Sequence, residues 1–186
     1  MAQTESLVCD FGRPAPEFRL TGVDGKIWTL KDVRGKNGLL VMFICNHCPY
    51  VKAVRRHIIR DARELEGHGI NSVAIMSNDP EEYAEDSFDN MKKVAAEFQY
   101  PFPYLYDETQ EIAKVYGAVC TPDFFGYNKD LKLQYRGRLD ASHKDTLPNA
   151  RRDLFEAMKQ VAQTGQGPKD QIPSIGCSIK WKKSNP

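Results

Sequence analysis

The amino-acid sequence predicts an α/β fold in which helices cover both faces of a mixed central sheet. An uninterrupted apolar run over residues 39–44 has the length of a fully buried strand. After Pro49 the apolar residues recur three or four positions apart, beginning at Val51, Val54 and Ile58, which is the spacing of an amphipathic helix. Further strand and helix patterns follow, with a hairpin signal on each side of them. This order predicts one mixed sheet with a helix layer on each face.

The segments before the central strand predict a surface arm and a β-hairpin. Residues 1–13 show no periodicity and are expected to lie along the surface. Two short alternating segments, 14–20 and 26–30, flank an Asp24-Gly25 turn, which is a typical hairpin signal.

A turn region over 31–37 is expected to lead into the central strand, 38–44. Proline suits the first turn of a helix, where its missing N–H leaves no hydrogen bond unmade, so Pro49 predicts the start of a helix that continues over 50–66.

The rest of the chain is expected to complete the sheet and add three helices. The predicted order is a strand at 71–76, a helix starting at 78–82, a strand at 102–105, a helix at 108–116, a hairpin of 119–127 with 131–136, and a helix at 145–163. The helix start at 78–82 is predicted from Pro80 followed by two acidic residues, and Gly117 predicts the end of the helix at 108–116.

The final segment, 165–186, is rich in turn residues but carries four large apolar side chains that need to be buried. These are Ile172, Ile175, Ile179 and Trp181. We therefore expect the tail to pack on the rest of the chain. A length of 186 residues suits one domain with a sizeable core, so residues 1–186 are expected to form a single domain.

Charge and composition argue against several functional classes. The 26 basic and 25 acidic residues nearly balance, so nothing calls for nucleic acid or a polyanionic substrate. No apolar run approaches the ~20 residues of a membrane span. The first residues lack the basic and apolar regions of a secretory signal, and five cysteines are too few, and odd in number, for a disulfide framework. A cytoplasmic protein with reduced thiols is expected.

The two cysteines between the central strand and its helix, Cys45 and Cys48, are the main functional candidates. They lie where free backbone N–H groups and the positive end of the helix dipole stabilise a thiolate and lower a thiol's pKa from about 8.5. The first sulfur of such a turn is normally the more exposed, so Cys45 is expected to attack and Cys48 to resolve the mixed disulfide.

Two other interpretations of the C-x-x-C spacing stay open. A zinc site needs four ligands, and no second C-x-x-C or H-x-x-x-H pair follows, which disfavours zinc. Two inert core thiols would also fit the spacing. The sequence of strand, C-x-x-C and helix favours a redox pair that needs neither a metal nor an organic cofactor.

Several motifs resemble the thioredoxin-like superfamily, and they cover nearly the whole chain. The chain is most similar to the branch that joins TlpA-like thiol-disulfide oxidoreductases with AhpC/TSA peroxiredoxins, and within it to peroxiredoxin-like proteins with a C-N-H-C-P-Y-V stretch. The matching segments are G-R-P-A-P-E-F at 12–18, C-N-H-C-P-Y-V at 45–51, an insertion at 78–105, Thr121-Pro122, and I-P-S-I-G-C-S-I-K-W-K at 172–182.

This resemblance implies a thioredoxin fold with an N-terminal hairpin and a peroxiredoxin-like insertion. It also implies that Cys45 attacks, that Cys48 resolves, and that Thr121 and a cis Pro122 line the substrate groove. His47 resembles the residue before the second cysteine of DsbA-type oxidases, where an imidazole stabilises the thiolate; the alternative is an exposed bystander. Cys120 is expected to face the pair as an auxiliary thiol, or else to be packed and inert.

Two positions depart from these families. The buried acid that moves protons in thioredoxin is replaced by Leu39, and the threonine that orients peroxide in peroxiredoxins falls at Met42 or Cys45, depending on the alignment. Arg136 or Arg138 can replace the missing threonine as a donor to peroxide only if one of them points at the cysteines.

The predicted function is a thiol-disulfide oxidoreductase that acts on protein or small thiol substrates. The alternatives are a thiol peroxidase recycled by a thioredoxin-type electron donor, and a non-catalytic binding module. The sequence predicts no oligomeric state and assigns no role to Cys9 or Cys177.

Overall fold

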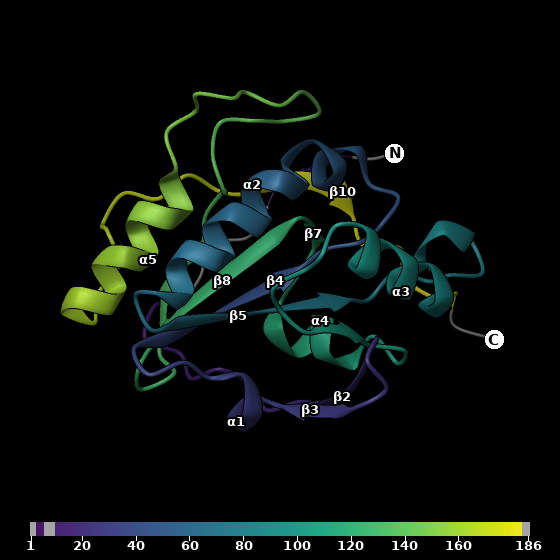
Figure 1. Cartoon of the computed structure of the whole chain (residues 1–186), viewed down its shortest axis with the longest axis horizontal. Helices are drawn as coiled ribbons and strands as arrows, with labels where there is room; N and C mark the ends of the chain where they lie inside the picture. The colour runs from purple at the N-terminus through teal and green to yellow at the C-terminus, as the bar shows by residue number, and fades with distance from the viewer. Residues whose placement is uncertain (1–2, 6–9, 184–186) are drawn as a thin grey trace.

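The computed structural model describes residues 3–5 and 10–183. The strands of a seven-stranded mixed sheet follow the order β3-β2-β6-β5-β4-β8-β9. Its strands β5, β4 and β8 run side by side through the centre (Figure 1). Strands β4, β5 and β6 are parallel to one another, whereas the other neighbours pair antiparallel. The strands are β2 (Arg19–Gly22), β3 (Ile27–Thr29), β4 (Gly38–Phe43), β5 (Ile70–Met76), β6 (Tyr104–Tyr106), β8 (Asp123–Asn128) and β9 (Leu133–Tyr135). This mixed sheet agrees with the predicted fold class.

Helices cover both faces of the sheet, as the sequence predicts (Figure 1). Side chains of β4 alternate between the two faces of the sheet. Leu40 and Met42 pack in the core under one group of helices, and Leu39 and Val41 pack in the core under the group on the other face. Both faces of the strand are buried, which explains its unbroken apolar run. The first group is α2 (Pro49–Glu66), α3 (Phe88–Glu97) and α5 (Asp153–Thr164); the second is α1 (Leu30–Val33) and α4 (Glu111–Tyr116).

A second, three-stranded sheet pairs strands from both ends of the described chain with the short strand that precedes β8. Its order is β1 (Gln3–Glu5), β10 (Ile175–Ser178) and β7 (Cys120–Thr121), all antiparallel. The N-terminal arm thus contains a strand that its sequence pattern did not indicate. Cys9 lies outside the described residues.

The tail packs on the chain only in part. Ile179 is buried, but Ile172 and Trp181 keep 50% and 39% of their surface exposed, so the expectation that all four apolar side chains are buried is wrong for these two. The division into one domain over 1–186 stays a prediction.

Two helix predictions need correction in the first half of the chain. The expected turn at 31–37 contains α1, because the Asp32 carboxylate accepts hydrogen bonds from the Thr29 backbone and hydroxyl at 2.9 and 2.6 Å and caps a short helix. The expected helix at 78–82 is a turn instead, since the Asp79 carboxylate accepts the Glu81 N–H at 3.1 Å.

The third helix, α3, begins only after Ser87, and the last helix, α5, also begins later than predicted. The Ser87 hydroxyl accepts the Asn90 N–H at 3.4 Å and so caps α3. Residues before Asp153 form a loop in which Leu147 is exposed and the Thr146 hydroxyl donates to the Ala53 carbonyl at 2.6 Å. Leu147 therefore does not belong to the apolar stripe of α5. In the described part of the chain, no helix has the length and apolar character that crossing a membrane requires.

Candidate redox site

Cys45 and Cys48 occupy the turn between β4 and α2. Cys48 is the residue before the helix, and Pro49 takes the first helical position as predicted. The exposed fractions of the two residues are 1% and 0%, so both are buried and the expected exposure of Cys45 is not seen. Both cysteines are free thiols. Strand β7, which precedes β8, packs directly on the turn and covers both cysteines.

One residue of β7, Thr121, contacts both sulfurs. The Thr121 hydroxyl lies 3.3 Å from the Cys45 Sγ, and the Cys48 Sγ donates to the Thr121 carbonyl at 3.2 Å. The Thr121–Pro122 peptide bond is cis, in agreement with the resemblance. The structure therefore brings Cys45, Cys48, Thr121 and Pro122 together from segments more than 70 residues apart.

The pKa values of the two thiols are shifted in opposite directions. Burial raises the pKa of Cys45 well above its usual range, and the charge of Asp86 adds to the effect. The Cys45 S–H hydrogen bond lowers the pKa of Cys48 to about 5, helped by the Cys177 thiol and by backbone N–H groups of Val51 and Cys177. Of the two thiols, Cys48 therefore ionises first, and it gives up its hydrogen bond to the Thr121 carbonyl when it does. The predicted lowering of the pKa holds for Cys48 and is wrong for Cys45.

A thiolate titration checks this assignment. Because the folded pKa of Cys48 is about 5, we expect the reduced protein to gain thiolate absorbance near 240 nm as pH rises through about 5, and to keep it at neutral pH. Cys48→Ser should remove this transition and Cys120→Ser should leave it in place. A first thiolate transition above pH 8 would contradict the assignment.

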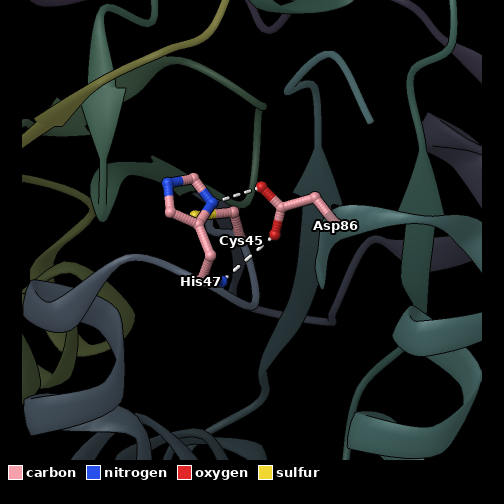
Figure 2. A group of neighbouring side chains, drawn as sticks. All are labelled: Cys45, His47 and Asp86. Atoms are coloured by element: carbon pink, nitrogen blue, oxygen red, sulfur yellow. Dashed lines mark hydrogen bonds and ion pairs between the residues drawn. The ribbon is translucent and has the colours of Figure 1, made fainter. Parts of the chain in front are cut away.

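His47 is held by a buried carboxylate that the sequence analysis missed, Asp86. Its Oδ2 lies 2.5 Å from the His47 Nδ1, and its Oδ1 accepts the His47 backbone N–H at 3.1 Å (Figure 2). Oδ1 also accepts the backbone N–H of Asn46, at 2.7 Å. Asn78 donates to Oδ2 as well, at 2.8 Å. Asp86 is fully buried, and the Tyr83 ring stacks on the imidazole with the ring centroids 4.2 Å apart. His47 is therefore not an exposed bystander.

The hydrogen bond to Asp86 fixes the orientation of the imidazole. Although burial opposes it, hydrogen bonds from His47 and Asn78 hold the pKa of Asp86 below its ordinary value, so Asp86 is a carboxylate that accepts the Nδ1 hydrogen. The His47 Nε2 is buried and has no hydrogen-bond partner among the described residues. No local signal in the sequence links positions 39 residues apart, which explains why Asp86 was missed.

Cys45, His47 and Asp86 also offer three metal-binding atoms that lie within 4.8 Å of one another. Thiolate, imidazole and carboxylate are ligands that zinc accepts. Here, however, the imidazole Nδ1 and the carboxylate are already hydrogen-bonded to each other, so only the His47 Nε2 and the Cys45 sulfur are left to bind a metal. The expectation that the site works without a metal stays a prediction.

The remaining candidates do not reach the sulfurs of the pair. The Cys120 Sγ lies 3.6 Å from the Pro122 carbonyl, and burial raises its pKa, so it fits a packed thiol. Arg136 forms a buried ion pair with Asp123 at 3.0 Å. The Arg138 Nε donates to Asp153 at 2.8 Å. Both guanidinium groups thus already have carboxylate partners away from the cysteines.

Arg138 instead lines a cavity of about 80 Å³ beside Pro122. Tyr50, from the first turn of α2, and Ser174, from the tail, form other parts of its wall. The cavity therefore opens next to the residue that the resemblance assigns to the substrate groove.

Comparison with known proteins agrees with this geometry. A crystal structure of a conserved protein from Geobacillus kaustophilus is 49% identical, with 100% of this chain and 99% of that chain covered and a TM-score of 0.93. The thiol-disulfide oxidoreductase ResA of Bacillus thuringiensis is 26% identical over 67% of each chain.

A thioredoxin-family thiol:disulfide interchange protein from Chlorobium tepidum has the same fold, with a TM-score of 0.63, 17% identity, and coverage of 83% of this chain and 99% of its own. The AhpC/TSA family model matches residues 11–136, which is more than half of the sequence. The chain therefore belongs to the AhpC/TSA family, in the thioredoxin-like superfamily.

Proposed function

We propose that the protein is a thiol-disulfide oxidoreductase in which Cys45 attacks the substrate and Cys48 resolves the mixed disulfide. The observation that carries this proposal is the hydrogen-bonded pair of free thiols beside the cis Thr121–Pro122 bond. Relatives that are themselves called thiol-disulfide oxidoreductases support it.

The shared proton of the pair gives the reaction a balanced path. As the Cys45 sulfur attacks a substrate disulfide, its proton passes to the Cys48 thiolate, and one substrate sulfur leaves as a thiolate. That thiolate takes the proton back from Cys48. The Cys48 thiolate then attacks the Cys45 sulfur, so the Cys45–Cys48 disulfide forms and the second substrate thiolate is released.

His47 and Asp86 supply a buried acid-base group in place of the thioredoxin acid, whose position is occupied here by Leu39. Asp86 fixes the imidazole beside Cys45, and Nε2 has no hydrogen-bond partner among the residues that the structure describes. A neutral imidazole nitrogen can accept a proton from a thiol and return it to a leaving sulfur. We therefore assign Asp86 to positioning His47, and His47 to accepting the Cys45 proton when Cys48 is itself protonated.

Protein disulfides and dithiols, or small thiols, are the proposed substrates, and a thioredoxin-type protein is a possible electron donor. The cavity beside Pro122 is the proposed place for part of the substrate, since Thr121 itself is already paired with β10. The cytoplasmic location stays a prediction.

Peroxide reduction is the second candidate, because the chain belongs to the AhpC/TSA family and the Thr121 hydroxyl lies 3.3 Å from the Cys45 sulfur. This hydroxyl comes from a different segment than the peroxiredoxin threonine. Cys45 is nevertheless buried, and Arg136 and Arg138 are paired elsewhere. We expect peroxide reduction to be weak, because each missing donor costs a factor of about 10²–10³.

Two assays on the same preparation separate the candidates. The protein should accelerate dithiothreitol-dependent reduction of insulin, while stopped-flow mixing of the reduced protein with hydrogen peroxide should give only a slow reaction. Arg138→Ala should leave the peroxide rate unchanged, since Arg138 is held by Asp153. A rate close to that of a dedicated peroxidase, lost in Arg138→Ala, would favour the peroxidase and overturn the preferred function.

A further inference from the structure

A third thiol, Cys177, lies at the redox pair. In the antiparallel pairing of β10 with β7, Cys177 is directly opposite Thr121. Residues directly opposite each other in such a pair project to the same face. The Thr121 side chain contacts the Cys45 sulfur, so the Cys177 side chain also faces the C-x-x-C turn.

Cys48 is the sulfur that Cys177 contacts. The thiol and the backbone N–H of Cys177 both help to lower the pKa of Cys48, which places Cys177 beside the Cys48 sulfur. Cys45 contacts the same sulfur from its own position in the turn. Cys177 is 2% exposed, and it packs in the same apolar cluster as the other two cysteines. Cys48 therefore lies between two thiols, each able to form a disulfide with it.

Cys120 makes a natural comparison, since it is next to Thr121 in β7 but its sulfur contacts the Pro122 carbonyl. Its partner across the strands is Ser178, one residue after Cys177. Side chains alternate along a strand, so Cys120 and Cys177 project to opposite faces of this small sheet.

We propose that Cys177 is a third exchanging thiol, which attacks Cys48 in the Cys45–Cys48 disulfide, forms a Cys48–Cys177 disulfide and releases Cys45. The proposal rests on the proposed function, because it starts from the disulfide that the oxidoreductase reaction produces.

The step is balanced within the protein. The Cys177 thiol loses its proton, and its sulfur bonds to the Cys48 sulfur while the Cys45–Cys48 bond breaks. Cys45 leaves as a thiolate and takes up one proton. One disulfide is broken and one is formed, so no external oxidant or reductant is consumed.

The exchange separates the two tasks of the site. The oxidising equivalents are held by Cys48 and Cys177, while Cys45, the sulfur beside His47 and Thr121, becomes free. The free Cys45 thiol can then react with a second substrate while the Cys48–Cys177 disulfide is still in place.

Peptide mapping tests the proposal. Trypsin places Cys45 and Cys48 on peptide 37–52, Cys177 on peptide 170–180 and Cys120 on peptide 115–129. The Cys45→Ser protein is oxidised with glutathione disulfide, quenched in acid, alkylated and digested. We expect peptides 37–52 and 170–180 to be joined. The link should be lost in Cys45→Ser/Cys177→Ser and kept in Cys45→Ser/Cys120→Ser.

Circular dichroism verifies that each variant is folded, and Cys45→Ala replaces Cys45→Ser if the latter is not. A folded variant whose Cys48 and Cys177 are both alkylated, with no joined peptides, would overturn the proposal. If the wild-type protein then still forms a disulfide inside peptide 37–52, the proposed function stands and only the exchange fails. If the wild-type protein forms no disulfide in that peptide either, the oxidoreductase function and the exchange fall together.

Discussion

Replacing either cysteine of the C-x-x-C turn should stop catalysed disulfide exchange, but the two variants should fail at different steps. Cys45→Ser removes the attacking sulfur, so no adduct with the substrate forms. Cys48→Ser keeps the attacking thiol and removes its resolver, so mixed disulfides accumulate on Cys45. Insulin reduction measures the loss of activity, and non-reducing electrophoresis with mass spectrometry detects the adducts.

Cys120→Ser is the matched control, because its sulfur contacts the Pro122 carbonyl and not the pair. It should retain exchange. The roles of the two cysteines would be reversed if Cys45→Ser accumulated adducts and Cys48→Ser did not. Since the pKa of Cys48 is the lower of the two, this comparison decides directly which of the two sulfurs attacks the substrate.

Asp86→Ala should destabilise the protein strongly. The carboxylate accepts hydrogen bonds from two backbone N–H groups and two side chains while fully buried. Removing it leaves these donors without a partner, and breaking such a buried charged network typically costs about 3–5 kcal/mol. Urea unfolding followed by circular dichroism measures the free energy of unfolding.

The exposed neighbour Asp89 provides a control, because its pair with Lys92 is open to solvent and Asp89→Ala should change stability by less than about 1 kcal/mol. The effect of Asp86→Ala should also depend on pH. The folded pKa of Asp86 is below its ordinary value, so its contribution is present above about pH 4 and is lost as pH falls through the folded pKa. A small destabilisation at pH 7 would contradict the role assigned to Asp86.

Residues close together in the sequence could be predicted well. The strand, the C-x-x-C turn and the helix after it follow from one local pattern, because burial on both faces of β4 and Pro49 at the start of α2 each leave a sequence signal. Helix starts were harder, since the Asx turn at Asp79 and the loop at Leu147 depend on contacts that periodicity does not encode.

Two members of the site could not be predicted, because they join it from distant segments. Asp86 reaches His47 from the insertion after β5, and Cys177 reaches Cys48 through a strand formed by the tail. Proximity to Thr121 in the sequence favoured Cys120 instead. Cys177 lies at the cysteine pair because it is directly opposite Thr121 in the pairing of β10 with β7. That position follows from the strand register and not from the local sequence.

The measurement that tests the central claim most directly is the redox equilibrium of the Cys45–Cys48 disulfide in glutathione buffers. A thiolate pKa of about 5 at Cys48, compared with about 7 in thioredoxin, stabilises the reduced form by up to about 2.7 kcal/mol at pH 7. With 30 mV corresponding to about 1.4 kcal/mol, the account predicts a potential above thioredoxin's −270 mV by up to about 60 mV. A potential at or below about −270 mV would contradict the thiolate assignment. Failure to form a disulfide within peptide 37–52 at any glutathione ratio would contradict the oxidoreductase function itself.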